Sequence, residues 1–190
     1  MRRHPLLKRL AVVLGATMCL VLAPVAEATV QVQLSRAELV QRADLVVRAT
    51  VASQASTWNE SHTQIRTITQ LRVSAYLKGT GPLTLALRQL GGSVDNLRMD
   101  VPGDARLAPG QDVVVFLRQG VGVVYLSAMA QSVYYIQPSA TGVPTVQRNL
   151  HDLAFARLSQ SGMTLQEAPD EPPESLDHLA RDIVTAGGAR

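Results

Sequence analysis

One segment constrains the fold more than any other: residues 64–78 alternate between apolar or β-branched and mostly polar side chains. Successive side chains of a β-strand point to opposite faces, so a period of two predicts a strand with one buried and one exposed face. Strands usually span about 3–10 residues, and we expect this longer one to bend. The residues expected on its buried face are Ile65, Thr67, Thr69, Leu71, Val73, Ala75 and Leu77.

Six further segments are rich in apolar and β-branched residues and are bounded by turn-forming residues, so we expect them to be strands as well. They cover residues 44–52, 83–90, 112–118, 121–127, 131–137 and 143–150. Between them, residues 53–63 have no period and many turn formers, which predicts a loop, and residues 93–111 are expected to be irregular. Short strands joined by Gly and Pro turns predict a mainly β fold, a small barrel or sandwich.

Two helices flank the strands. Ser35 and Glu38 have the spacing of a capping box, which predicts a short helix over residues 36–42. Near the C-terminus, Leu176, Leu179, Ala180, Ile183 and Val184 form one apolar stripe, which predicts an amphipathic helix over residues 175–186. We expect this helix to dock on the barrel; the alternative is a detachable helix that binds a partner. Residues 160–174, acidic and Pro-rich, are expected to be a linker.

Residues 1–28 have the pattern of a cleavable secretory signal: a basic start, an apolar stretch from Leu10 to Ala23, and Ala26-Glu27-Ala28 before Thr29. The alternative is an uncleaved N-terminal anchor. The signal predicts a protein that is periplasmic or extracellular, with no membrane span after cleavage. The expected organisation is a signal over 1–28, a β-barrel domain over 29–159, the linker over 160–174 and the helix over 175–186.

Removal of the signal changes the composition of the chain. The mature part carries 14 basic and 14 acidic residues, so its net charge is near zero, and the only cysteine, Cys19, is lost. Nucleic-acid binding depends on clustered Lys and Arg, which argues against that class of partner. Without cysteine there is no disulfide, no thiol nucleophile and no cysteine-ligated metal.

Three stretches of the first half resemble the netrin-like module of tissue inhibitors of metalloproteinases, an OB-type barrel. They are a short helix running into a strand over residues 38–51, the long strand that ends at Leu77-Lys78-Gly79, and the turn from Pro109-Gly110 into an apolar strand ending at Leu117. The resemblance covers residues 35–118 and implies a small OB-like, netrin-like barrel. The chain as a whole also resembles uncharacterised secreted proteins of Gram-negative bacteria such as myxobacteria, which implies no activity.

The departure from the inhibitor family limits what the resemblance implies. Those inhibitors chelate the protease zinc through an N-terminal cysteine, whereas the expected mature N-terminus here is Thr29. The fold can be carried over, and the inhibitory mechanism cannot.

No catalytic motif stands out along the chain. The expected mature part has three histidines, His62, His151 and His178, without the spacing of a zinc site, and no serine lies in a recognisable nucleophile motif. Two weaker metal hypotheses remain, Glu60 with His62, and calcium at Asp95, Asp100 and Asp104. We therefore predict no catalytic residue, no resident metal and no cofactor.

The loop over residues 53–63 carries Trp58, the only tryptophan of the chain, beside Asn59, Glu60 and His62. An aromatic residue on a loop tip can anchor a partner, although it can equally fold over the barrel end. This loop together with residues 92–108 is the expected binding surface. The leading hypothesis is a non-enzymatic module that binds a protein or a cell-envelope component. The alternatives are a hydrolase with a dispersed site, and a protease-associated inhibitor or chaperone.

Overall fold

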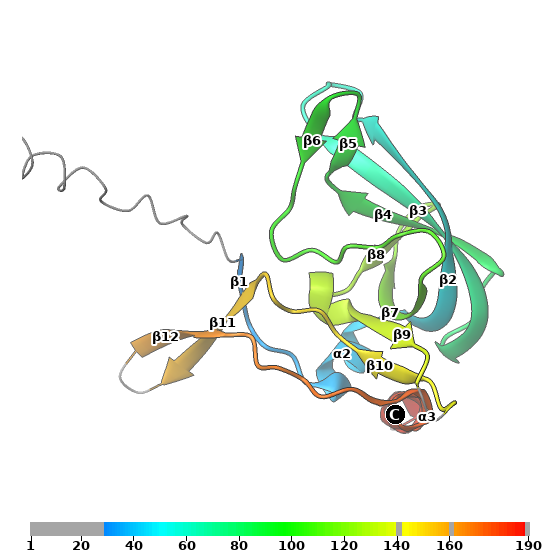
Figure 1. Ribbon diagram of the computed structural model, residues 1–190, viewed down its shortest axis with the longest axis vertical. Coiled ribbons are helices and arrows are strands. Elements are labelled where there is room, and N and C mark those ends of the chain that lie inside the picture. Colours follow the sequence, from blue (N-terminus) through cyan, green and yellow to red (C-terminus); the bar gives the residue numbers. More distant parts are fainter. Residues whose placement is uncertain (1–28, 140–141, 160–161, 189–190) are drawn as a thin grey trace, which may run out of the picture.

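The computed structural model describes residues 29–139, 142–159 and 162–188, so the expected signal over 1–28 lies outside the described residues. Five strands form a closed barrel (Figure 1). They are β2 (Leu45–Trp58), β3 (Ile65–Lys78), β4 (Thr84–Leu90), β7 (Asp112–Gln119) and β8 (Val124–Leu126).

The strand order closes the barrel. The strands run β7-β2-β3-β4-β8, and β8 pairs back with β7, so each barrel strand pairs with two others of the barrel. All of these pairs are antiparallel except β4 with β8, which meet in parallel where Leu87 lies opposite Val124. This arrangement is compatible with an OB-like barrel and confirms the predicted mainly β fold with a short N-terminal and a C-terminal helix.

The alternation in β3 is confirmed as far as Val73. Ile65, Thr69, Leu71 and Val73 are buried, on the face that lines the barrel. Beyond Val73 the prediction is wrong, because two irregularities in the pairing with β2 shift the register. Ala75 lies opposite the outward-facing Arg48, and Leu77 packs on the outside of the barrel, while Tyr76 packs against the interior.

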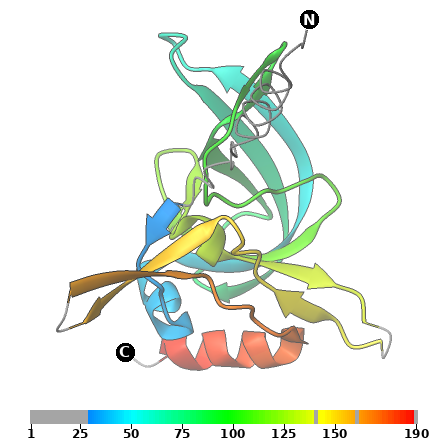
Figure 2. The ribbon, with the colours of Figure 1, turned by 60° about the vertical axis from the view of Figure 1, so that its left-hand side comes forward.

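Strand β7 is buried on both faces. Val113, Val115 and Leu117 belong to the core inside the barrel, and Val114 and Phe116 belong to a second apolar cluster outside it. This explains why the segment is continuously apolar rather than alternating. The second cluster is completed by helix α2 (Arg36–Arg42) and helix α3 (Leu176–Gly188). Both helices lie side by side across one end of the barrel (Figure 2).

Both predicted helices form, each for the expected physical reason. The Ser35 hydroxyl accepts the Glu38 N–H at 3.3 Å, and a Glu38 carboxylate oxygen accepts the Ser35 N–H at 2.8 Å, so the capping box is present. In α3, Leu176, Leu179 and Ile183 are buried against α2 and the barrel wall. Three residues of the predicted stripe therefore dock on the chain's own domain, whereas the prediction is wrong for Val184, which is exposed.

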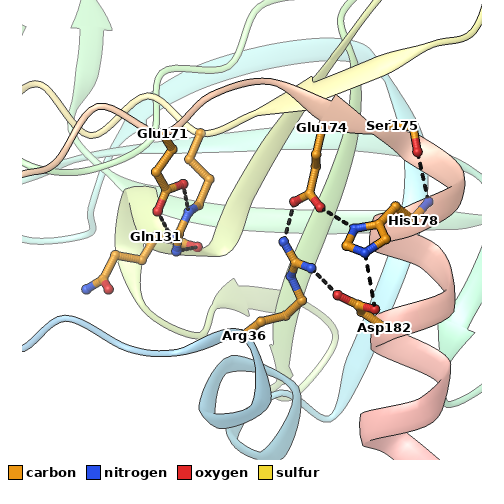
Figure 3. A network of polar contacts seen from close by, with 8 residues as sticks. Arg36, Gln131, Glu171, Glu174, Ser175, His178 and Asp182 are labelled. Carbon is orange, nitrogen blue, oxygen red and sulfur yellow. Dashed lines mark hydrogen bonds and ion pairs between the residues drawn. The ribbon is translucent and has the colours of Figure 1, made fainter.

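A network of charged side chains joins α3 and the segment before it to α2 (Figure 3). Arg36, at the start of α2, pairs with both Glu174 and Asp182, and these two carboxylates also contact the ring of His178. Nearby, Arg148 pairs with Glu171. The Arg36 and Arg148 guanidinium groups lie over the ring of Tyr134, at 6.0 and 5.2 Å from its centroid. These contacts hold the C-terminal segment against the barrel.

Several elements lie where the sequence predicts none. The hairpin of β5 (Gly92–Val94) and β6 (Leu97–Met99) forms inside the segment expected to be irregular. Strand β12 (Gly162–Glu167) lies in the expected linker and pairs with β11 (Leu153–Ser159), which in turn pairs with β1 (Thr29–Gln31). The β11–β12 hairpin projects from the body, and all six residues of β12 are exposed. A strand exposed on both faces needs no apolar side chains on either face, so its sequence does not alternate and does not predict a strand.

The remaining elements adjoin the barrel. The 3-10 helix η1 (Met129–Ser132) leads into β9 (Val133–Gln137), which pairs with β7 and with β10 (Thr145–Gln147). Strand β13 (Glu174–Ser175) pairs with β10 and leads directly into α3. In the part of the chain that the structure describes, no helix is long and apolar enough to cross a bilayer.

The burial pattern of β3 gives a matched pair of variants. Val73 is buried in the barrel and its neighbour Arg72 is exposed. Val73→Asp places an unpaired charge in the core, and we expect it to cost more than about 3 kcal/mol, enough to unfold much of the protein. Arg72→Asp is expected to change the free energy of unfolding by less than about 1 kcal/mol. Urea unfolding followed by circular dichroism measures both; equal effects would contradict the assigned faces.

The docking of α3 can be tested in the same way. Leu179 is fully buried, whereas Val184 of the same helix is 57% exposed. We expect Leu179→Ala to lower the free energy of unfolding by about 2–5 kcal/mol and Val184→Ala to lower it by less than about 0.5 kcal/mol. A small effect of Leu179→Ala on thermal unfolding would show that the helix is not docked in solution.

Candidate functional site

The inner face of the barrel changes from apolar to polar toward one end. Three rows of residues cross β2, β3 and β4, and the pairing of these strands defines them. The first row is Val51, Leu71 and Leu85; the second is Gln54, Thr69 and Leu87; the third is Ser56, Thr67 and Gln89. The barrel therefore has a polar mouth above an apolar core.

These polar side chains bond to one another. The Gln54 amide donates to the Thr69 hydroxyl at 2.9 Å, and the Ser56 and Thr67 hydroxyl oxygens lie 2.8 Å apart. Thr69 is completely buried, so its bond to Gln54 satisfies a polar group that water does not reach. The extra residue Ala52 in β2 gives the strand a bulge between the first and second rows, and bulged strands characteristically bend.

The β5–β6 hairpin and the segment that follows it cover part of this mouth (Figure 1). The approach is close at Gly92, where a Cβ atom would collide with the hydroxyl groups of Thr67 and Ser56. Gly92 also has a φ of 127°, which side chains other than glycine rarely adopt. The Thr67 hydroxyl donates to the Gly91 carbonyl at 2.7 Å, which ties the hairpin to the barrel.

Between the barrel and this cover lies a cavity of about 370 Å³, which we call the barrel-mouth cleft. This volume lies within the range of small-ligand sites, roughly 300–1,000 Å³. Its polar lining comes from the barrel rows and from the covering segment. The lining residues used below are Gln54, Ser56, Thr67, Gln89, Leu90, Ser93, Arg98, Met99, Asp100, Val101, Asp104, Arg106 and Leu107.

Charges in the cleft differ in how they are neutralised. Arg98 and Asp100 form an ion pair with each other, and Arg106 pairs with Asp152. Asp104 instead accepts hydrogen bonds from neutral donors, the Ala105 N–H at 2.8 Å and the Gln89 amide at 3.2 Å. Burial raises the pKa of Asp104 above its ordinary value, against the opposing effect of these two hydrogen bonds.

The structure places the predicted site residues at the tip of the β2–β3 hairpin. The expected loop over 53–63 is wrong in its first half, because β2 continues to Trp58 and pairs with β3 up to Ile65. Polar cross-strand pairs such as Ser56 with Thr67 support this extension, although they resemble loop composition in the sequence. Trp58 is half-buried, with its ring centroid 6.2 Å from that of His62.

Asn59 organises the tip. Its side-chain oxygen accepts the N–H groups of Thr63 and Gln64, at 2.8 and 3.1 Å, and its amide nitrogen donates to the hydroxyls of Ser61 and Thr63. Glu60 and His62 are exposed. Trp58, Asn59, Glu60 and His62 do not line the barrel-mouth cleft, whereas Gln54 and Ser56 from the same predicted segment do.

Other candidate sites have less support. His62 lies in the turn between β2 and β3, His151 lies between β10 and β11, and His178 lies in α3. Among the described residues, no group of three or more His, Cys, Asp or Glu side chains is placed to hold a metal ion. A second cavity, of about 610 Å³, lies beside Tyr135, Arg148 and His151. The arginines that line it are already paired, Arg106 with Asp152 and Arg148 with Glu171.

A scan against models of protein families gives no match for this chain, and a search of curated proteins finds none that is significantly similar.

The raised pKa of Asp104 predicts a pH dependence of stability. Its folded-state pKa exceeds its unfolded-state pKa, so the folded protein binds a proton more readily as the pH falls through that window. The melting temperature of the wild type, relative to that of Asp104→Asn, should therefore rise between pH 7 and about pH 4.

Asp100→Asn is the matched control for this measurement. The hydrogen bond from Arg98 lowers the pKa of Asp100, so the wild type should lose stability relative to Asp100→Asn as the pH falls below about 4. If the melting temperature of the wild type instead falls relative to that of Asp104→Asn on acidification, the Asp104 carboxylate is paired with a cation in solution.

Proposed function

We propose that the protein is an exported, non-enzymatic binding module, periplasmic or extracellular once residues 1–28 are removed, and that the barrel-mouth cleft is its binding site. One observation carries this proposal: the inner face of the barrel is polar where it meets the cleft, in the row formed by Ser56, Thr67 and Gln89.

Stability alone does not account for that row. Leucine fills the equivalent positions one or two rows below, at Leu85 and Leu87, and apolar burial there stabilises the fold. Polar groups facing a barrel interior gain little on folding, because each must recover the hydrogen bonds that it had with water. Several such groups around one cleft are typical of a site that binds a ligand by hydrogen bonds.

The partner that we propose is a protein or a cell-envelope component. The resemblance of residues 35–118 to netrin-like modules supports a binding role, since this range contains β2, β3, β4 and the whole lining of the cleft. The near-zero charge of the mature chain argues against nucleic acid. Among the described residues, no observation favours the hydrolase or the protease-associated alternative.

Site-specific cross-linking tests the proposal. A photo-cross-linking amino acid is placed either at Ser93, an exposed residue that lines the cleft, or at Arg181, an exposed residue of α3. The full chain is expressed in its native cells so that export occurs normally. We expect a discrete adduct in the exported fraction from position 93 and none from position 181. Excess mature protein without the photo-cross-linking residue should reduce the yield of this adduct.

Three outcomes would contradict the proposal. Adducts of equal yield from both positions would indicate non-specific contact, and the absence of a competed adduct at position 93 would show that the cleft binds no partner. Retention of the chain in the cytoplasm, measured by fractionation, would contradict the proposed export.

A further inference from the structure

Within the described residues, Asp104 is the one charged side chain lining the barrel-mouth cleft that has no oppositely charged partner. We propose that the cleft binds a lysine side chain of a protein partner, with Asp104 as the counter-ion of the lysine ammonium group. This inference rests on the proposed function and deepens it, because it names the chemistry that the cleft recognises.

The Asp104 carboxylate is held in place by the protein. The Ala105 N–H donates to Oδ1 and the Gln89 amide donates to Oδ2, and the same Gln89 amide also donates to the Ala105 carbonyl at 2.8 Å. An ionised carboxylate has about four acceptor positions, so both oxygens can accept further hydrogen bonds. The carboxylate is therefore preorganised, and an incoming cation need not order it.

An ammonium group has three donors, and the cleft that Asp104 lines also offers neutral acceptors. The amide nitrogen of Gln54 donates to Thr69, and that of Gln89 donates to Asp104 and to Ala105. The amide oxygens of both glutamines are therefore the atoms that can accept a hydrogen bond from a ligand. The hydroxyls of Ser56 and Thr67 lie in the same row as Gln89. A charge-assisted bond to Asp104 with one or two neutral acceptors would satisfy the ammonium group.

The rest of the lining fits the aliphatic stem of lysine. Part of the lining is apolar and consists of Leu90, Met99, Val101 and Leu107. The methylene groups of a lysine side chain can pack against these residues while its ammonium group reaches the polar part of the cleft. No aromatic side chain lines the cleft, so the stacking surface on which a sugar ring could lie is absent from the described lining. These features favour lysine over an amino sugar.

The electrostatics of Asp104 agree with this assignment. Burial raises its pKa, which means that the ionised form is poorly solvated in the free protein. A cation bound beside it would favour the ionised form, so binding should weaken as the pH falls and Asp104 becomes protonated. The facing charged groups are Arg98 with Asp100 and Arg106 with Asp152, and each pair is neutral as a whole.

Titration of the purified mature chain with n-butylammonium tests the inference, with n-butanol as the neutral probe of similar shape. We expect saturable nuclear magnetic resonance shifts of the Ala105 amide and of the Gln54 and Gln89 side chains. Affinity for n-butanol should be at least about tenfold weaker, since the charge-assisted bond is lost. Asp104→Asn should weaken n-butylammonium binding by a similar factor, and binding should weaken on acidification.

Asp177→Asn is the matched control, since it removes the same charge from an exposed residue of α3 that does not line the cleft. We expect this variant to bind n-butylammonium within about twofold of the wild type. Well-dispersed spectra of both variants show that they are folded. Equal binding of n-butanol and n-butylammonium, or unchanged binding in folded Asp104→Asn, would overturn the inference. Tighter binding of glucosamine than of n-butylammonium would also overturn it, in favour of an amino sugar.

The cross-link at position 93 separates this inference from the proposed function. If the cleft binds lysine, the adduct should be lost in Asp104→Asn and retained in Asp177→Asn. An adduct that persists in folded Asp104→Asn would be consistent with the proposed function and would overturn the inference that the cleft binds lysine. If the wild type forms no competed adduct, the proposed function itself fails, whatever the amine titration shows.

Discussion

The burial of β7 on both faces is the constraint on which the rest of the structure depends. Val113, Val115 and Leu117 complete the barrel core, while Val114 and Phe116 need a second apolar layer outside it. The chain provides that layer with α2 and α3, which come from its two ends. A barrel without these helices would expose a strip of large apolar side chains to water, at a cost of about 1.5–3 kcal/mol for each. The helices are therefore part of the barrel domain and not appendages to it.

The polar contacts around α3 have a different role from the apolar ones. Buried or half-buried ion pairs contribute little net stability, because desolvation offsets their attraction. They do define position, since Arg36 meets Glu174 and Asp182 from two elements, and Arg148 is held between Glu171 and the ring of Tyr134. Apolar burial thus drives the helix onto the barrel, and we expect the charge network to fix its orientation. The same division holds at the barrel mouth, where apolar rows support the fold and polar rows form the cleft.

Sequence reasoning succeeded where one local pattern determines the structure. The alternation from Ile65 to Val73, the Ser35–Glu38 capping box and the stripe of Leu176, Leu179 and Ile183 each follow from a single periodicity or spacing. It failed where structure depends on residues far apart. The bulges that turn Tyr76 inward arise from pairing with β2, and exposed β12 has no face to reveal it. The expected surface over residues 53–63 and 92–108 contains most of the cleft lining, but the barrel wall of the cleft was missed. Gln54 and Ser56 resemble a loop in composition, and only the register with Thr67 and Gln89 shows that they line a barrel.

The parallel pairing of β1 with β11 bears on how the protein folds. Thr29 lies beside Leu153, and Arg36 bonds to Asp182, a residue 146 positions further along the chain. Contacts this distant in sequence require the closure of very long loops, and proteins dominated by them fold slowly, in milliseconds to seconds. The helical layer over β7 cannot be completed until almost the whole chain is available. During synthesis the N-terminal part of the chain appears first, so the outer face of β7 stays partly exposed until α3 has been made. A chaperone that binds during this interval would have the greatest effect on the yield of folded protein.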